Sequence, residues 1–409
     1  MPIYLTAMKP TFSVTEGFLP AAARLGLSVI LLTDRVEDHL QEYQGSDHKP
    51  AAIELANVND PADVASRIAG LRTRFGKAEA LLSNSDHLQF STSAAAELLG
   101  LPTKDWRAAL RCKNKALTRQ TLADAGLDSV FSLELRPDQE PTSVAETLPY
   151  PVVLKPREGV ATEDVAYISH PAEFIAAITE IRKSRGPVTL VVEEYLTGKF
   201  YSYDTLGDDD QTVAFGSWHT ELSAPPFFHE LRDQWHPELP ASVVDSLNAQ
   251  LSALGVNFGA CHTEFVSERE RARIIEVNYR LIGGGMEAFT SQVLGVDLFA
   301  EVISLHQGAT LSSELRAAVA GAAKKAARVE YVFAEHPGQL ISAPPTSDTR
   351  LENGVRLLNR PLQELGSTVT AGNTKRDFLS AVQGIGADDE AVQAAIAGFV
   401  AANSWTVTS

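Results

Sequence analysis

The feature that most constrains this chain is a pair of largely apolar segments joined by a charged one, within residues 259–285. This pattern predicts an antiparallel hairpin, because both flanks have the composition of strands and the joint is polar. If the loop is symmetric about its middle residue, Glu264 lies directly opposite Glu276. The same register places His262 opposite Asn278.

The polar side chains of this hairpin are expected to share one face. Side chains alternate along a strand, so Glu276, Asn278 and Arg280 point to the same side. Two facing carboxylates with β-carbons roughly 5 Å apart repel each other. The opposite face is mostly apolar and is expected to hold Cys261, Thr263, Phe265, Ile275 and Val277.

A divalent cation would turn the repulsion of the two acids into attraction. Mg²⁺ typically takes one or two protein carboxylates and completes its shell with phosphate oxygens and water. An arginine next along the same face can pair with a phosphate or a developing anion. The alternative is a solvent-facing hairpin with scattered charges. Four polar groups of metal-site chemistry on one face favour the metal site.

The hairpin carries Glu264 and then Glu276-Val277-Asn278-Tyr279-Arg280, which resembles the paired strands of the ATP-grasp superfamily. With the glycines that follow, it looks most like the carboxylate–amine ligases and L-amino-acid ligases, and biotin carboxylase is a more distant relative. The resemblance implies ATP and Mg²⁺ (or Mn²⁺) as cofactors. It implies that Glu264, Glu276 and Asn278 hold the metal and that Arg280 is catalytic.

The resemblance implies that two lysines contact the nucleotide phosphates. Lys115 heads a predicted helix at the family's spacing, although such a lysine is usually solvated, and Lys113 is the alternative. Lys155 ends an apolar strand, where a buried ammonium needs a counter-anion that a phosphate can supply. Thr162 stands at the hydroxyl position of the family's phosphate loop, which here keeps a single glycine, Gly159.

Residues 188–196 predict a buried strand that ends in a hinge. In the family this hinge faces adenine, which implies that Glu193, Glu194 and Leu196 bind ATP, with Glu193 near the exocyclic amine. An edge strand with exposed acids is the alternative. Phe200 stands where the family has a ribose-binding glutamate, so no ribose-binding residue is assigned.

Three glycines precede a predicted helix, and the N–H groups at a helix N-terminus bind anions. We therefore expect Gly283, Gly284 and Gly285 to bind a substrate carboxylate, with His262 as a further substrate-binding residue. A tight turn that serves packing is the alternative, and both can hold.

Strands and helices alternate through residues 1–110, which predicts a parallel layer of α/β class. The loop after the first strand lacks G-x-G-x-x-G, so a dinucleotide site there is disfavoured. The predicted fold is α/β (α+β), an ATP-grasp fold with a C-terminal extension. Its expected parts are a Rossmann-like N-domain (1–110), an ATP-grasp domain (111–320) with a mobile lid at about 128–205 and a central part at 206–320, and a biotin carboxylase-like C-terminal domain (321–409).

The formal charge of −17 disfavours nucleic acid and membrane as partners, because both attract basic surfaces. The N-terminus lacks the pattern of a signal peptide, and we expect a cytoplasmic protein. The expected partners are a small-molecule acid and an amine, and a homodimer is left open.

The function that the sequence favours is an ATP-dependent ligase. It would join a small carboxylic acid, in the first instance an amino acid, to an amine through an acylphosphate, releasing ADP and phosphate. The alternatives are a bicarbonate-activating carboxylase of the biotin or purine type and a nucleotide-binding module without turnover.

Overall fold

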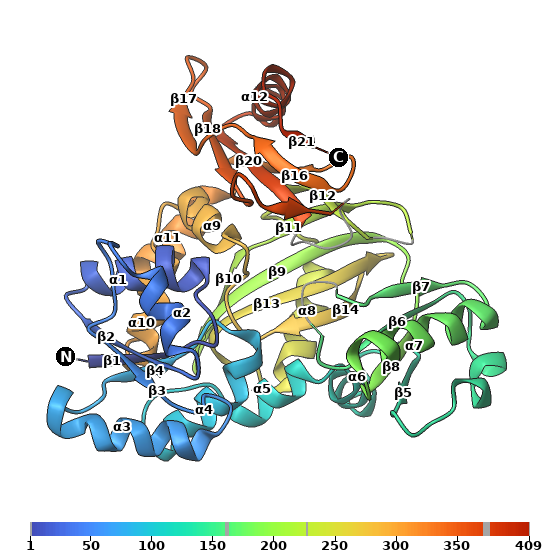
Figure 1. Ribbon diagram of the computed structural model, residues 1–409, viewed down its shortest axis with the longest axis horizontal. Coiled ribbons are helices and arrows are strands. Elements are labelled where there is room, and N and C mark those ends of the chain that lie inside the picture. Colours follow the sequence, from blue (N-terminus) through green and yellow to red (C-terminus); the bar gives the residue numbers. More distant parts are fainter. Residues whose placement is uncertain (1, 160–162, 226–227, 371–376, 409) are drawn as a thin grey trace.

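The computed structural model describes residues 2–159, 163–225, 228–370 and 377–408. Figure 1 shows one long sheet through the middle of the molecule, with the N-terminal residues on one side and residues near 130–195 on the other. The C-terminal residues lie at the top of this view. Parallel and antiparallel sheets both occur, which confirms the predicted mixed α/β class.

The N-terminal region is built on a parallel sheet in the order β3-β2-β1-β4. Its inner strands and β4 are short runs of mostly buried apolar residues, as parallel strands covered on both faces require, whereas the edge strand β3 is partly exposed. The strands are β1 (Pro2–Thr6), β2 (Ser28–Thr33), β3 (Ala52–Leu55) and β4 (Ala80–Leu82). The helices are α1 (Leu19–Arg24), α2 (Val36–Glu42), α3 (Pro61–Phe75), α4 (Gln89–Leu98) and α5 (Trp106–Lys113), with a π-helical turn at Ser13–Phe18 and a 3₁₀ turn at Asp86–Leu88.

A second, antiparallel sheet in the order β5-β8-β6-β7 forms the part of the chain where a lid is expected. Helix α7 packs against it through Phe174, Ile178 and Ile181, which share a core with the strands. The elements are α6 (Lys115–Asp124), β5 (Ser132–Leu135), β6 (Val152–Pro156), β7 (Ala166–Ile168), α7 (Pro171–Arg185) and β8 (Leu190–Glu194), with 3₁₀ turns at Pro141–Ser143 and Ala145–Thr147.

The long sheet runs β14-β13-β9-β11-β12-β15-β20-β18-β17, with β10 paired to β9. Strand β12 pairs with β15, so the sheet continues across residue 320, where the sequence places a domain boundary. The elements before that boundary are β9 (Lys199–Asp208), β10 (Thr212–Gly216), β11 (Trp218–Leu222), β12 (Glu230–Trp235), α8 (Ala241–Leu254), β13 (Phe258–Glu268), β14 (Arg271–Asn278), α9 (Met286–Leu294), α10 (Leu298–His306) and α11 (Ser313–Ala322).

The C-terminal residues add four strands to the long sheet and a small sheet of their own in the order β19-β16-β21. Helix α12 covers β20 through Val392 and Ile396. The elements are β15 (Ala326–Phe333), β16 (Gly338–Ser342), β17 (Ser347–Arg350), β18 (Arg356–Pro361), β19 (Thr368–Val369), β20 (Phe378–Gly386), α12 (Asp389–Ala402) and β21 (Thr406–Thr408).

One apolar core joins the N-terminal sheet to helices α9 and α10 and to the long sheet. At its centre Phe18 meets Phe299 edge-on, with ring centroids 5.0 Å apart. A β-carbon on Gly17 would lie 2.2 Å from the Phe299 ring, so only glycine permits this close approach. The packing fixes the loops that follow β1 and β4 beside the glycine-rich segment after β14.

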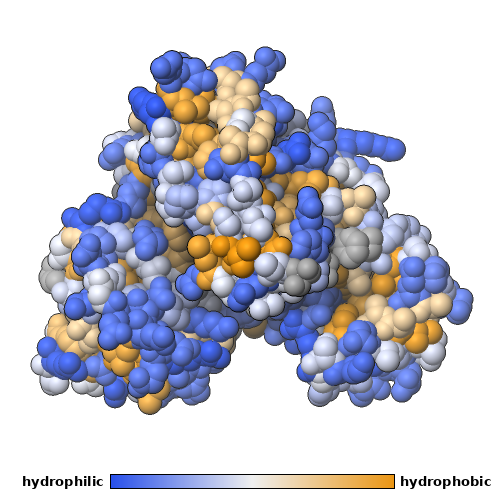
Figure 2. Space-filling model, turned by 45° about the horizontal axis from the view of Figure 1, so that its top comes forward, coloured by the Kyte–Doolittle hydropathy of each residue, from blue (hydrophilic) through white to orange (hydrophobic). Residues whose placement is uncertain are grey.

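Within the described residues, no single helix is long and apolar enough to cross a membrane; α9 and α10 would meet that test only as a pair, across a bend of 100°. Figure 2 shows that the two lower lobes of the molecule are separated by a deep hollow in the surface.

Candidate active site

The β13–β14 hairpin has the predicted register at its functional end. Glu264 pairs with Glu276, and His262 pairs with Asn278. The loop is shorter than expected, because the strands continue to a two-residue turn, Arg269-Glu270, in which both residues have positive φ.

A β-bulge next to Glu264 reconciles the tight turn with this register. On the turn side of the bulge, Phe265 pairs with Ile274, which leaves Ile275 as the extra residue of β14. Without an extra residue the alternation would turn Glu276 to the other face. Ile275 therefore does not join the apolar face as expected: it lines the same pocket as Glu276. The other members predicted for the apolar face, Cys261, Thr263, Phe265 and Val277, are buried.

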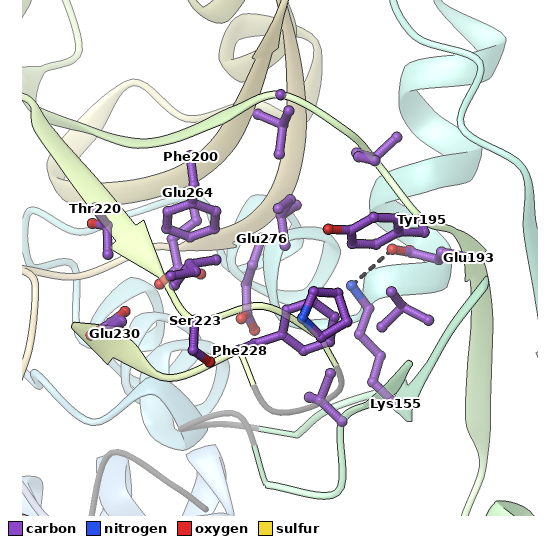
Figure 3. Close-up of a pocket in the computed structure, with 18 of the residues that line it drawn as sticks. Lys155, Glu193, Tyr195, Phe200, Thr220, Ser223, Phe228, Glu230, Glu264 and Glu276 are labelled. Carbon is purple, nitrogen blue, oxygen red and sulfur yellow. Dashed lines mark ion pairs between the residues drawn. The ribbon is translucent and has the colours of Figure 1, made fainter. Parts of the chain in front are cut away.

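A pocket of about 470 Å³ lies between the hairpin, the second sheet and the β11–β12 strands. Figure 3 shows Lys155 and Glu193 on one side of it and Glu264 on the other. The pocket brings together seven residues that the sequence assigns to ATP or metal: Lys115, Lys155, Glu193, Glu194, Leu196, Glu264 and Glu276.

Glu193 is the centre of a buried group of charges. Its carboxylate accepts two hydrogen bonds from Arg119, at 2.8 and 2.9 Å, and pairs with Lys155 Nζ at 2.8 Å. Burial alone would raise the pKa of Glu193, but the two cations lower it to about 2. Burial lowers the pKa of Lys155, and Glu193 opposes that change. The sequence predicted a phosphate as the counter-anion of Lys155. The protein itself supplies that anion, as Glu193.

Lys115 makes the second ion pair of the pocket. Its Nζ donates to Glu276 Oε1 at 2.7 Å and to the carbonyl of Gly159 at 3.1 Å. Its backbone N–H donates to the carbonyl of Arg157, so both ends of this residue hold the loop after β6. Burial lowers the pKa of Lys115, but Glu276 outweighs it and the pKa is raised. The alternative lysine, Lys113, instead pairs with Asp86.

His262 lies deeper along the hairpin than Glu264. Its Nδ1 is 2.7 Å from Asp204 Oδ1, and its Nε2 is 3.5 Å from Glu264 Oε1. Burial lowers the pKa of His262, but Asp204 and Glu264 raise it to about 9. Each of the two facing acids therefore has a partner that offsets their mutual repulsion. Glu276 pairs with Lys115, and Glu264 pairs with His262.

Arg280 lies between the hairpin and the glycine-rich segment. Its Nη2 donates to Asn278 Oδ1 at 3.2 Å, and its Nη1 donates to the carbonyl of Leu281 at 2.7 Å. Asp86, after β4, is 3.9 Å from Arg280 Nε. The predicted residues His262, Asn278, Arg280 and Gly283–Gly285 do not line the pocket. His262 and Asn278 lie farther along β13 and β14, and the others follow the end of β14. Thr162 lies outside the described residues.

The three glycines form the entry to α9, and two of them have positive φ. Arg360 of β18 donates to the carbonyl of Gly284, and a β-carbon on Gly285 would lie 1.6 Å from its guanidinium. Below them, Glu287 is fully buried and accepts a 2.5 Å hydrogen bond from Ser13. Arginine side chains and a buried acid, whose pKa is raised by burial, thus lie around this turn.

Comparison with known proteins agrees with this geometry. Residues 148–288 match the family model described as the ATP-grasp domain. The chain contains an ATP-grasp domain. The matched residues include Lys155, the hinge after β8 and the whole β13–β14 hairpin.

Two curated relatives resemble the chain over part of its length. One is an uncharacterized protein of Sinorhizobium fredii, y4rH, 28% identical over 306 residues, which are 72% of this chain and 61% of that protein. The other is the ATP-grasp enzyme fsqD of Aspergillus fumigatus, 26% identical over 266 residues, which are 61% of this chain and 45% of that protein. The match therefore spans only about half to three fifths of these relatives' lengths.

Solved structures share the fold over nearly the entire chain. An L-amino acid ligase from Bacillus licheniformis superposes with a TM-score of 0.79 at 18% identity, covering 100% of this chain and 99% of that one. The biotin carboxylase domain of 2-oxoglutarate carboxylase from Hydrogenobacter thermophilus, solved with MgADP and bicarbonate, has a TM-score of 0.69 at 17% identity and covers 99% and 91%. These likenesses confirm the predicted ATP-grasp fold.

The ATP-grasp domain offers donors that fit a magnesium ion. No group of three His, Cys, Asp or Glu residues is arranged for a metal within the ranges that the structure describes. Such a group is not required, because Mg²⁺ bound with a nucleotide takes one or two carboxylates and phosphate oxygens. Glu264 and Glu276 face each other across the strands and line the pocket, so they are the donors best placed for it.

Several residues at or near the site escaped sequence reasoning. Arg119 is buried and holds Glu193, and its position one turn after Lys115 on α6 was the available signal. Tyr195 and Phe228 face the pocket with ring centroids 6.0 Å apart, although nothing in the sequence brings these two segments together. Arg360 comes from β18, in the C-terminal residues, to which the sequence assigns no site residue.

Proposed function

We propose that this protein is an ATP-dependent ligase that activates a small carboxylic acid as an acylphosphate and joins it to an amine. The observation that carries the proposal is the pocket in which the facing pair Glu264 and Glu276 meets Lys115 and Lys155. Acids for a metal and ammonium groups for phosphates are the equipment of phosphoryl transfer from ATP. The products would be ADP and phosphate.

The roles follow from position. Lys115 and Lys155 would bind the nucleotide phosphates, and the hinge Glu193-Glu194-Tyr195-Leu196 would hold the base. Glu264 and Glu276, with Asn278 next along the strand, would hold Mg²⁺, which when bound neutralises phosphate charge. Arg280, between Asn278 and the glycines, would stabilise the charge that develops on the transferred group.

The thiols of the chain give no support to a covalent enzyme intermediate. Both cysteines are buried, and burial raises the pKa of Cys261 to about 12. A thiol of this kind is a poor nucleophile at neutral pH. Direct attack of the substrate carboxylate on the γ-phosphorus therefore suits this site better.

An amino acid is the substrate that best suits the surroundings of the glycine turn. Arg280 and Arg360 lie beside the glycines, and the acid Glu287 lies behind them. The two guanidinium groups match the carboxylate of such a substrate. The likeness to an L-amino acid ligase supports the same class. The biotin carboxylase likeness favours bicarbonate as the second candidate for the activated acid.

Phosphate release measured against pairs of amino acids, small polycarboxylic acids and amines tests the proposal. We expect release that depends on both an acid and an amine and that does not require bicarbonate. Release that depends on bicarbonate alone would replace the ligase with the carboxylase.

Arg280→Ala should lower the turnover number more than it weakens ATP binding, because its charge matters most in the transition state.

A further inference from the structure

We propose that Lys115 is the ion-pair partner of Glu276 until nucleotide binds, in the position that a divalent cation takes afterwards. Metal and nucleotide then bind through an exchange of ion-pair partners. The metal takes Glu276 and the phosphates take Lys115. The inference rests on the nucleotide and metal sites of the proposed function, and it is independent of which acid and amine are joined.

The contact between the side chains of Lys115 and Glu276 is close and largely protected from water. Lys115 Nζ lies 2.7 Å from Glu276 Oε1, with 7% and 19% of the two side chains exposed. In the described part of the chain, Glu276 has no other ion-pair partner. A charge pair sheltered in this way is screened weakly by salt. A cation that binds Glu276 must therefore compete with the ammonium of Lys115.

The second lysine of the pocket is arranged differently. Lys155 pairs with Glu193, which also accepts two hydrogen bonds from Arg119. When Lys155 turns to a phosphate, Glu193 keeps a cation. When Lys115 turns to a phosphate, Glu276 keeps none, and its closest carboxylate neighbour across the strands is Glu264. Glu264 keeps His262, so Glu276 is the acid of the pair whose charge a metal ion would then balance.

The exchange makes metal and nucleotide support each other's binding. Metal binding frees Lys115 from Glu276, and phosphate binding frees Glu276 from Lys115. Each ligand therefore makes the other bind more tightly, and this coupling of the two sites is reciprocal. Couplings of this kind change affinities by factors of about 5 to 150. The lysine also carries the coupling to the loop after β6, because it donates to the carbonyls of Gly159 and Arg157.

Titration of the nucleotide-free protein with Mn²⁺, followed by the paramagnetic resonance signal of free Mn²⁺, tests this inference. Lys115→Met should bind Mn²⁺ about tenfold more tightly than the wild type, because Glu276 is released. Lys199→Met is the matched control, since Lys199 lines the same pocket and pairs with no carboxylate among the described residues. No gain in Lys115→Met, or an equal gain in both variants, would contradict the exchange.

A second experiment does not depend on the folding of Lys115→Met. Binding of ATP in EDTA, measured by calorimetry, should be at least about fivefold tighter in Glu276→Gln than in Glu264→Gln. Both variants remove one negative charge from the facing pair, but only the first releases Lys115. Equal affinities would overturn the inference. Neither experiment uses an acid or an amine, so failure of the ligase proposal would leave these outcomes unchanged.

Discussion

Glu276→Gln should lower ATP turnover by at least about a hundredfold, the scale of losing one electrostatic contact to a reacting group. The amide keeps the size of the side chain, and Lys115 keeps the carbonyl of Gly159 as an acceptor, so the fold should persist. What is lost is the charge that faces Glu264 and that a metal would bridge. Turnover at saturating Mg²⁺ and thermal unfolding, measured on one preparation, separate these effects.

Glu270→Gln is the control for this substitution. Glu270 is exposed at the turn of the same hairpin, so the variant has the same change in charge far from the pocket. Its turnover should match the wild type. If Glu276→Gln also kept its activity at saturating Mg²⁺, the metal assignment would be wrong.

Glu193→Gln should lower the free energy of unfolding by about 3–5 kcal/mol, the cost of removing one partner from a buried charge pair. Arg119 and Lys155 would both keep their charge in a buried place without a carboxylate. Denaturant unfolding measures the loss. Glu180→Gln, on the exposed face of α7, should change stability by less than about 0.5 kcal/mol.

The effect of Glu193 should depend on pH with a definite sign. The pKa of this carboxyl is lowered to about 2 in the folded protein from its ordinary value of 4.5. A lowered pKa gives stability that is complete above the unfolded value and is lost as pH falls toward the folded value. The stability difference between wild type and Glu193→Gln should therefore shrink between about pH 4.5 and pH 2. A difference that stayed constant over this range would show that the charge is not its cause.

The sequence predicted the hairpin and its register because two signals agreed there. Two largely apolar segments that flank a charged one predicted the strands, and the pairings of Glu264 with Glu276 and His262 with Asn278 followed from the spacing. The bulge at Ile275 could not be predicted, because it depends on the two-residue turn and on how β14 packs. Two compensating differences, a tighter turn and one extra residue, preserved the predicted pairs.

The ion-pair partners of the site were beyond sequence reasoning. Lys155 was correctly expected to need an anion, but that anion is Glu193, on a neighbouring strand of the second sheet. Arg119 is one turn after Lys115 on α6, but its pairing with Glu193 depends on tertiary packing, as does the approach of Arg360 to the glycine turn. The same holds for the continuation of the long sheet past residue 320, since strand pairing between β12 and β15 has no local signal.

The identity of the nucleotide product tests the central claim most directly. The protein is incubated with ATP, Mg²⁺ and an acid that supports phosphate release, without amine and with hydroxylamine as a trap. If the acid is activated by the γ-phosphoryl group, ADP and the hydroxamate of the acid should form in equal amounts. AMP and pyrophosphate as the stoichiometric products would instead mean that the acid is adenylated, and they would contradict the mechanism and the proposed function.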